Sequence, residues 1–172
     1  MQPIMTSTLV MAVGEIAHAD GGAAIHATRY LKSHYDLPDT TYLDVAMPGK
    51  SLAADIAAVE NLIIIVAMQL NAEPGAVRIF EDSAVHEFLG SASRSAREAK
   101  LAKLMQQLRD TGELPVRCAL IGIQPGERTS GESLSERVRR SMPRAAGNAA
   151  TLVYRWRRPL PGTADEHPIT TA

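Results

Sequence analysis

The chain has 172 residues, of which 45% are hydrophobic and 22% charged. This is the size and composition of one globular domain with a buried core, and it excludes a disordered or fibrous protein. The formal net charge of -1 gives no overall indication of a nucleic acid or an anionic membrane as partner. Cys118 is the single cysteine, which excludes an intramolecular disulfide and any multi-cysteine metal site.

No targeting or membrane-spanning segment is recognisable in the sequence. The first thirteen residues contain an apolar stretch but no basic region before it, which is not the pattern of a secretory signal. The longest apolar run, Leu62 to Met68, is far shorter than a bilayer crossing requires. We therefore expect a cytoplasmic protein that does not contact a membrane.

Apolar runs and helical periodicity predict alternating strands and helices. The predicted strands are residues 9–13, 41–46, 62–67, 76–81 and 116–123, and the predicted helices are residues 20–34, 51–59, 96–109 and 132–146. The run 62–67 is apolar at every position, which is typical of a central strand covered on both faces. This order predicts an α/β fold, a three-layer αβα sandwich with a mainly parallel, twisted five-stranded sheet and helices on both faces.

The domain is expected to span residues 1–152. The segment 153–172 is rich in Pro, Gly and Thr towards its end and is expected to be a flexible C-terminal tail.

Ligands of open α/β sheets gather at the carboxyl ends of the strands, so the loops that follow the predicted strands are the candidate cleft. The residues that could line this cleft and bind a partner are Gly14, Glu15, His18, Asp20, Asp44 and Gly49. Neither of the glycine-rich nucleotide-binding fingerprints is present. Two readings of the first loop stay open: His18 and Asp20 begin a metal site, or Asp20 caps the following helix and His18 is an ordinary loop residue.

Several segments, in their order and spacing, resemble the [NiFe]-hydrogenase maturation endopeptidases. The segments that carry the resemblance are LVMAVGEIAHADGGAA at 9–24, LDVAMPG at 43–49, LIIIVA at 62–67, LMQQLRDTGELP at 104–115 and ALIGIQP at 119–125. They keep the family's loop anchors at Gly14 and Asp20, and its strand-end positions at Asp44 and Gly49. The resemblance covers about residues 8–147 and implies an α/β fold with a twisted sheet between helices.

The departures from the family bear on function. In that family one Glu, one Asp and one His engage the nickel of the immature large subunit, and the resemblance assigns these positions to Gly21, Val66 and Arg97. Glycine and valine side chains have no ligand atoms, and a guanidinium repels a cation. The resemblance therefore implies a chain with no catalytic residue, no metal ligand and no cofactor, and so favours a protein that is not an enzyme.

Three functions follow as hypotheses. The first is a non-catalytic relative that binds a [NiFe]-hydrogenase large subunit or its assembly factors. The second is an active, nickel-dependent endopeptidase for C-terminal processing, with a shifted site made of Glu15, His18 and Asp20. The third is reuse of the fold as a small-molecule-binding or regulatory protein. The first is the one that the three substitutions favour, and none of them involves nucleic acid.

Overall fold

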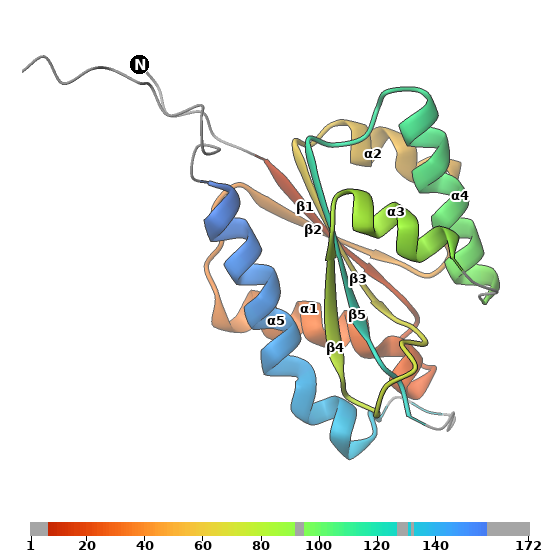
Figure 1. Ribbon diagram of the computed structural model, residues 1–172. Coiled ribbons are helices and arrows are strands. Elements are labelled where there is room, and N and C mark those ends of the chain that lie inside the picture. Colours follow the sequence, from red (N-terminus) through yellow and green to blue (C-terminus); the bar gives the residue numbers. More distant parts are fainter. Residues whose placement is uncertain (1–6, 92–94, 127–130, 132, 158–172) are drawn as a thin grey trace, which may run out of the picture.

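The computed structural model describes residues 7–91, 95–126, 131 and 133–157 (Figure 1). Its centre is a twisted sheet of five strands, β1 (Thr8–Val13), β2 (Thr40–Val45), β3 (Asn61–Ala67), β4 (Val77–Glu81) and β5 (Arg117–Ile123), in the order β2-β1-β3-β5-β4. Strands β2, β1, β3 and β5 are parallel, and β4 pairs antiparallel with β5. The predicted mainly parallel five-stranded sheet is confirmed.

Helices cover both faces of the sheet and complete the three layers (Figure 1). The long helices α1 (Ala23–His34) and α5 (Glu136–Trp156) pack against each other on one face. The other face carries α2 (Ala53–Ala57), α3 (Ser83–Gly90) and α4 (Ala96–Asp110). Two short 3-10 helices, η1 (Ala19–Gly22) and η2 (Lys50–Leu52), lead into α1 and α2.

The central strand β3 supplies both hydrophobic cores. Because side chains alternate across a strand, Ile63 and Ile65 lie in the core under α1 and α5, while Leu62, Ile64 and Val66 lie in the core under α2, α3 and α4. All five side chains are at most 1% exposed. This two-sided burial explains why the segment is apolar at every position.

The observed helices differ from the prediction in several places. Helix α1 begins at Ala23 rather than at Asp20, because residues 19–22 form η1. Helix α3 was not predicted, although its buried Val85 and Leu89 have the spacing of one helix face. Helix α5 begins at Glu136 and continues to Trp156, well past the predicted end at residue 146.

The predicted boundary between domain and tail lies inside α5. Leu152, Val153 and Trp156 are buried against the sheet, and this burial keeps the chain helical through Trp156. Residues 153–156 are therefore part of the domain, Arg157 is the C-cap of α5, and residues 158–172 of the expected tail lie outside the described residues. Among the described helices, none combines the length with the apolar character needed to cross a bilayer.

Candidate functional site

The candidate site lies at the carboxyl edge of β1, β2 and β3. In the sheet register Val13 lies opposite Val45 on one side and Val66 on the other, so the three strands reach this edge together. The next residue, Gly14, donates its amide hydrogen to the Val45 carbonyl oxygen at 2.9 Å. The loops that follow these strands therefore start side by side, where α/β sheets bind their ligands.

Close backbone contacts shape the loop between β1 and α1. A Cβ atom at Gly14 would lie 2.4 Å from the carbonyl oxygen of Gly21, and one at Gly22 would lie 2.7 Å from the carbonyl oxygen of Glu15. No side chain fits at such distances, so glycine is required at both positions. The loop is thus folded back on itself, with Gly21 against the end of β1.

Arg97, at the start of α4, reaches across to the same edge. Its Nε donates to the carbonyl oxygen of Ala46 at 2.8 Å, and Ala46 follows directly after β2. One terminal nitrogen of its guanidinium lies 3.9 Å from Oε1 of Glu15, and Oε2 of Glu15 lies 3.0 Å from Nε2 of His18. The Arg97 side chain is 21% exposed, so this cation lies partly sheltered between the first and second loops.

The three positions that the resemblance assigns to metal ligands lie around the end of β1. Gly21 is packed against Gly14, Val66 is paired with Val13, and Arg97 is bonded to Ala46, next to the partner of Val13. Val66 is 1% exposed and belongs to the core under α2, α3 and α4, so it presents an apolar side chain at this point. Of these three positions, therefore, only Arg97 brings a polar side chain to the edge, because Val66 is buried in the core and Gly21 has no side chain.

Asp20 is 3% exposed and its carboxylate accepts three hydrogen bonds from two other loops. Oδ1 accepts from the Ser135 amide at 2.7 Å, and Oδ2 accepts from the Ser135 hydroxyl at 2.7 Å and from the Gly126 amide at 2.9 Å. The expectation that Asp20 caps α1 is wrong, because the N-cap of that helix is Gly22 and makes no side-chain hydrogen bond. Asp20 instead fixes Ser135, the N-cap of α5.

The hydrogen bonds of Asp20 test the hypothesis that Glu15, His18 and Asp20 together form a shifted metal site. Glu15 and His18 contact each other, but both oxygens of Asp20 face Ser135 and Gly126. Within the described residues, no group of three or more His, Cys, Asp or Glu side chains is placed to hold a metal ion. The geometry therefore leaves a Glu15–His18 pair without a third ligand among those residues.

The structure does not join the other predicted cleft residues to this cluster. Asp44 lies on β2, opposite Ala12, with an exposed side chain that makes no hydrogen bond or ion pair to any described residue. Gly49 is the N-cap of η2 in an extended conformation, and a Cβ there would meet nothing within 4 Å. Among the described residues, no hydrogen bond or ion pair joins Asp44 or Gly49 to the side chains of Glu15 and Arg97.

Cys118 is excluded as a nucleophile by its surroundings. It lies on β5, is 4% exposed, and burial, followed by the charge of Asp82, raises the pKa of its thiol to about 12. The thiolate that nucleophilic chemistry needs is therefore strongly disfavoured at neutral pH. This fits the predicted role of a small buried hydrophobic residue.

Ser135 and Gly126 are the residues of this region that the sequence reasoning missed. They lie more than a hundred positions after Asp20, and a single sequence carries no local signal for such a long-range contact. The only available hint is that Ser135 precedes a helical pattern, which is typical of an N-cap.

Comparison with known proteins assigns the family. A sequence model described as "Hydrogenase maturation protease" matches residues 25–152. The chain is 30% identical over 163 residues to the hydrogenase expression/formation protein HoxM of Cupriavidus necator, covering 93% of this chain and 81% of that protein. It is 34% identical over 120 residues to the hydrogenase 2 maturation protease of Escherichia coli, covering 68% of this chain and 72% of that protein.

A solved structure, the hydrogenase maturating endopeptidase HybD from Escherichia coli, superposes with a TM-score of 0.80 at 28% identity, covering 87% of this chain and 93% of that one. The match of the family model, the similarity along most of the HoxM sequence and the shared α/β fold agree with one another. The chain belongs to the hydrogenase maturation protease family.

Proposed function

We propose that this protein acts by binding, without proteolysis, in the maturation or assembly of a [NiFe]-hydrogenase large subunit. The observation that carries the proposal is Arg97, whose guanidinium bonds to Ala46 and approaches Glu15 at the carboxyl edge of the sheet. A permanent positive charge at this place opposes the approach of a nickel ion carried by a substrate.

The residues around Arg97 support the same proposal. The positions of the other two ligands are Gly21 and Val66, and neither side chain can donate an electron pair to a metal. Val66 is also buried in the core rather than exposed at the edge. A protease that recognises its substrate through a metal in that substrate needs donor atoms here, and this chain has none at the three positions.

The surface that remains is suited to contact with another protein. The side chains of Glu15 and His18 are 41% and 55% exposed and stand at the edge beside Arg97. Such exposed polar groups on a rigid loop recognise partners through hydrogen bonds and charge. The expected partners are a hydrogenase large subunit or its assembly factors, with no cofactor of the chain's own.

The decisive experiment presents the purified protein with the nickel-loaded precursor of the large subunit from the same genome. We expect a complex in size-exclusion chromatography and an unchanged precursor mass by mass spectrometry. The hydrogenase 2 maturation protease of Escherichia coli, with its own precursor, is the positive control for cleavage. A shortened precursor that disappears with Glu15→Gln or His18→Gln establishes the shifted-site endopeptidase instead.

If the protein neither binds nor cleaves the precursor while the control protease cleaves its own, the result favours the third hypothesis, in which the fold serves as a small-molecule-binding or regulatory protein.

A variant with Glu, Asp and His at the three positions tests whether these positions correspond to the family's metal ligands. Gly21→Glu, Val66→Asp and Arg97→His together place two carboxylates and an imidazole around the end of β1. We expect isothermal titration to detect nickel binding by this variant and none by a matched variant with Gln, Asn and Gln at the same positions. If the restored variant folds and still binds no nickel, the positions are wrongly assigned and the proposal loses its main support.

A further inference from the structure

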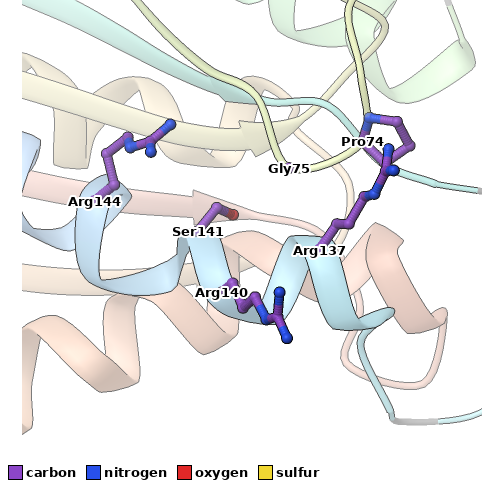
Figure 2. A pocket seen from close by; sticks show the side chains of 6 residues that line it. All are labelled: Pro74, Gly75, Arg137, Arg140, Ser141 and Arg144. Atoms are coloured by element: carbon purple, nitrogen blue, oxygen red, sulfur yellow. The ribbon is translucent and has the colours of Figure 1, made fainter.

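A second feature at the same edge of the sheet is a shallow pocket of about 200 Å³ between α5 and the loop that joins β3 to β4 (Figure 2). It is lined by Pro74, Gly75, Arg137, Arg140, Ser141 and Arg144. Figure 2 shows the Arg137 side chain beside Pro74 and the Arg144 side chain at the other end, with Ser141 between them. The resemblance and the proposed function assign no role to these residues.

The pocket and its rim carry a surplus of positive charge. Arg137 pairs with Glu73 at 3.1 Å, while Arg139 and Arg140 share the single carboxylate of Glu136. Arg144 is exposed and forms no ion pair with any described residue. Three arginines thus line the pocket beside two carboxylates, and Arg139, outside the lining, shares one of these carboxylates, so positive charge exceeds negative charge at the pocket.

The pocket is built on a fixed backbone. Gly75 has a φ of +87°, and a Cβ there would lie 2.5 Å from the carbonyl oxygen of Arg137, so the loop lies directly against the first turn of α5. One residue before α5, Ser135 is fixed by the buried carboxylate of Asp20. The loops that contain Asp20 and Gly75 therefore hold the start of α5 in place. Because the backbone that carries the arginines is fixed in advance, the entropic cost of binding is lower.

We propose that this pocket binds an acidic segment of a partner polypeptide, with two carboxylate side chains placed against Arg144 and the Arg137–Arg140 end. Guanidinium groups bind carboxylates through two parallel hydrogen bonds, and Arg144, which has no ion pair with a described residue, is the first such site. The inference goes beyond the proposed function, because it does not require the partner to be a hydrogenase protein.

The charge pattern favours separate carboxylates over a continuous polyanion. Glu73 and Glu136 stand among the arginines and repel a closely spaced run of phosphates. Among the described residues no aromatic side chain lines the pocket, so these residues provide no surface on which nucleic acid bases stack. A flexible peptide can place two carboxylates past these acidic side chains.

The test uses the full chain and fluorescence anisotropy with a labelled twelve-residue peptide of Asp, Glu, Gly and Ser, blocked at both ends. The matched probe has Asn and Gln in place of Asp and Glu, and an oligothymidylate of equal length is the polyanion probe. The variants are Arg144→Gln and Arg137→Gln. The control is Arg155→Gln, because Arg155 is exposed on the same helix but pairs with Glu81 outside the pocket.

We expect the acidic peptide to bind at low salt and the amide peptide not to bind. Arg144→Gln and Arg137→Gln each weaken the affinity about three- to tenfold, a range expected for partly exposed charge pairs, and Arg155→Gln changes it less than about twofold. Amide chemical shifts of Gly75 and Ser141 should move on titration.

Two results overturn the inference. One is an acidic peptide that does not bind, or that binds all three variants equally. The other is an oligothymidylate that binds more tightly than the peptide and loses affinity with the same variants, which identifies a general polyanion surface. Both results leave the separate test with the large-subunit precursor intact, so failure of the pocket and failure of the proposed function are distinguishable.

Discussion

The carboxylate of Asp20 binds both the backbone amide and the hydroxyl of Ser135, each at 2.7 Å, across 115 positions of sequence. This contact joins the loop after the first strand to the start of the last helix. Glu15 and His18 belong to the first of these segments, and the arginines of the pocket belong to the second. The two surfaces for which functions are proposed are thus parts of one connected edge.

Replacing the Asp20 carboxylate should weaken the fold. In Asp20→Asn one oxygen becomes an amide group that donates, and it then faces a donor from Ser135 or Gly126. Because the site is buried, we expect a loss of about 2–4 kcal/mol in the free energy of unfolding, measured by urea denaturation. Asp44→Asn, at an exposed carboxylate, is the control and should change it by less than about 0.5 kcal/mol. Equal losses in the two variants would contradict the role assigned to Asp20.

The close approach of Gly14 to Gly21 should make Gly14 intolerant of alanine. A Cβ at 2.4 Å from the carbonyl oxygen of Gly21 forces the first loop to move, and we expect Gly14→Ala to cost about 2–4 kcal/mol of unfolding free energy. Gly49→Ala is the matched control, since Gly49 is extended and has free space around it. A wild-type-like stability of Gly14→Ala would show that the loop rearranges freely.

The Cys118 thiol should react only when the protein unfolds. Burial raises its pKa to about 12, so at pH 8 the folded state contains very little thiolate and shields what there is. We expect slow labelling by iodoacetamide in buffer and fast labelling in denaturing urea, followed by mass spectrometry. Rapid labelling of the folded protein would mean that β5 is accessible at this point.

His86 should add a pH dependence to stability. Burial and then the charge of Arg109 lower its pKa in the folded state, whereas the unfolded chain has the ordinary value near ~6.5. Between the two pKa values the unfolded state binds more protons, so the free energy of unfolding falls as the pH drops below about 6.5 and rises again with pH. We expect His86→Gln to remove this part of the slope in urea titrations between about pH 5 and 7.5. If the free energy of unfolding of His86→Gln changes with pH as steeply as that of the unaltered protein, His86 is not the source of the slope.

Most of the fold could be predicted from the sequence because the buried strands leave a local signal. The apolar run at β3 and the turns after β1 and β5 indicate the strands directly, and their alternation with helices predicts the parallel sheet. Helix α3 was missed because it is short and only two of its residues, Val85 and Leu89, are buried. The C-terminal half of α5 was missed because the predicted end at residue 146 is followed by Gly147, a residue that commonly ends a helix, whereas the buried residues up to Trp156 keep the chain helical.

The candidate site was harder to predict for a different reason. The positions of Gly21, Val66 and Arg97 came from resemblance, and only the register of the strands and the reach of Arg97 to Ala46 bring them to one place. The role of Asp20 depends on a contact with Ser135 that no local pattern encodes. Composition excluded many kinds of site, but it could not show which polar residues support the fold and which face a partner.

The contact between Asp20 and Ser135 also determines which part of the chain must be present before this edge of the sheet can form. Its two ends are separated by most of the chain, so the first loop acquires its final shape only after the last helix has docked. A chain that ends before residue 135 lacks Ser135 and the arginines of α5, and therefore lacks both this contact and the arginine pocket. Because the edge is built from both segments, we expect recognition there only in chains that extend into α5.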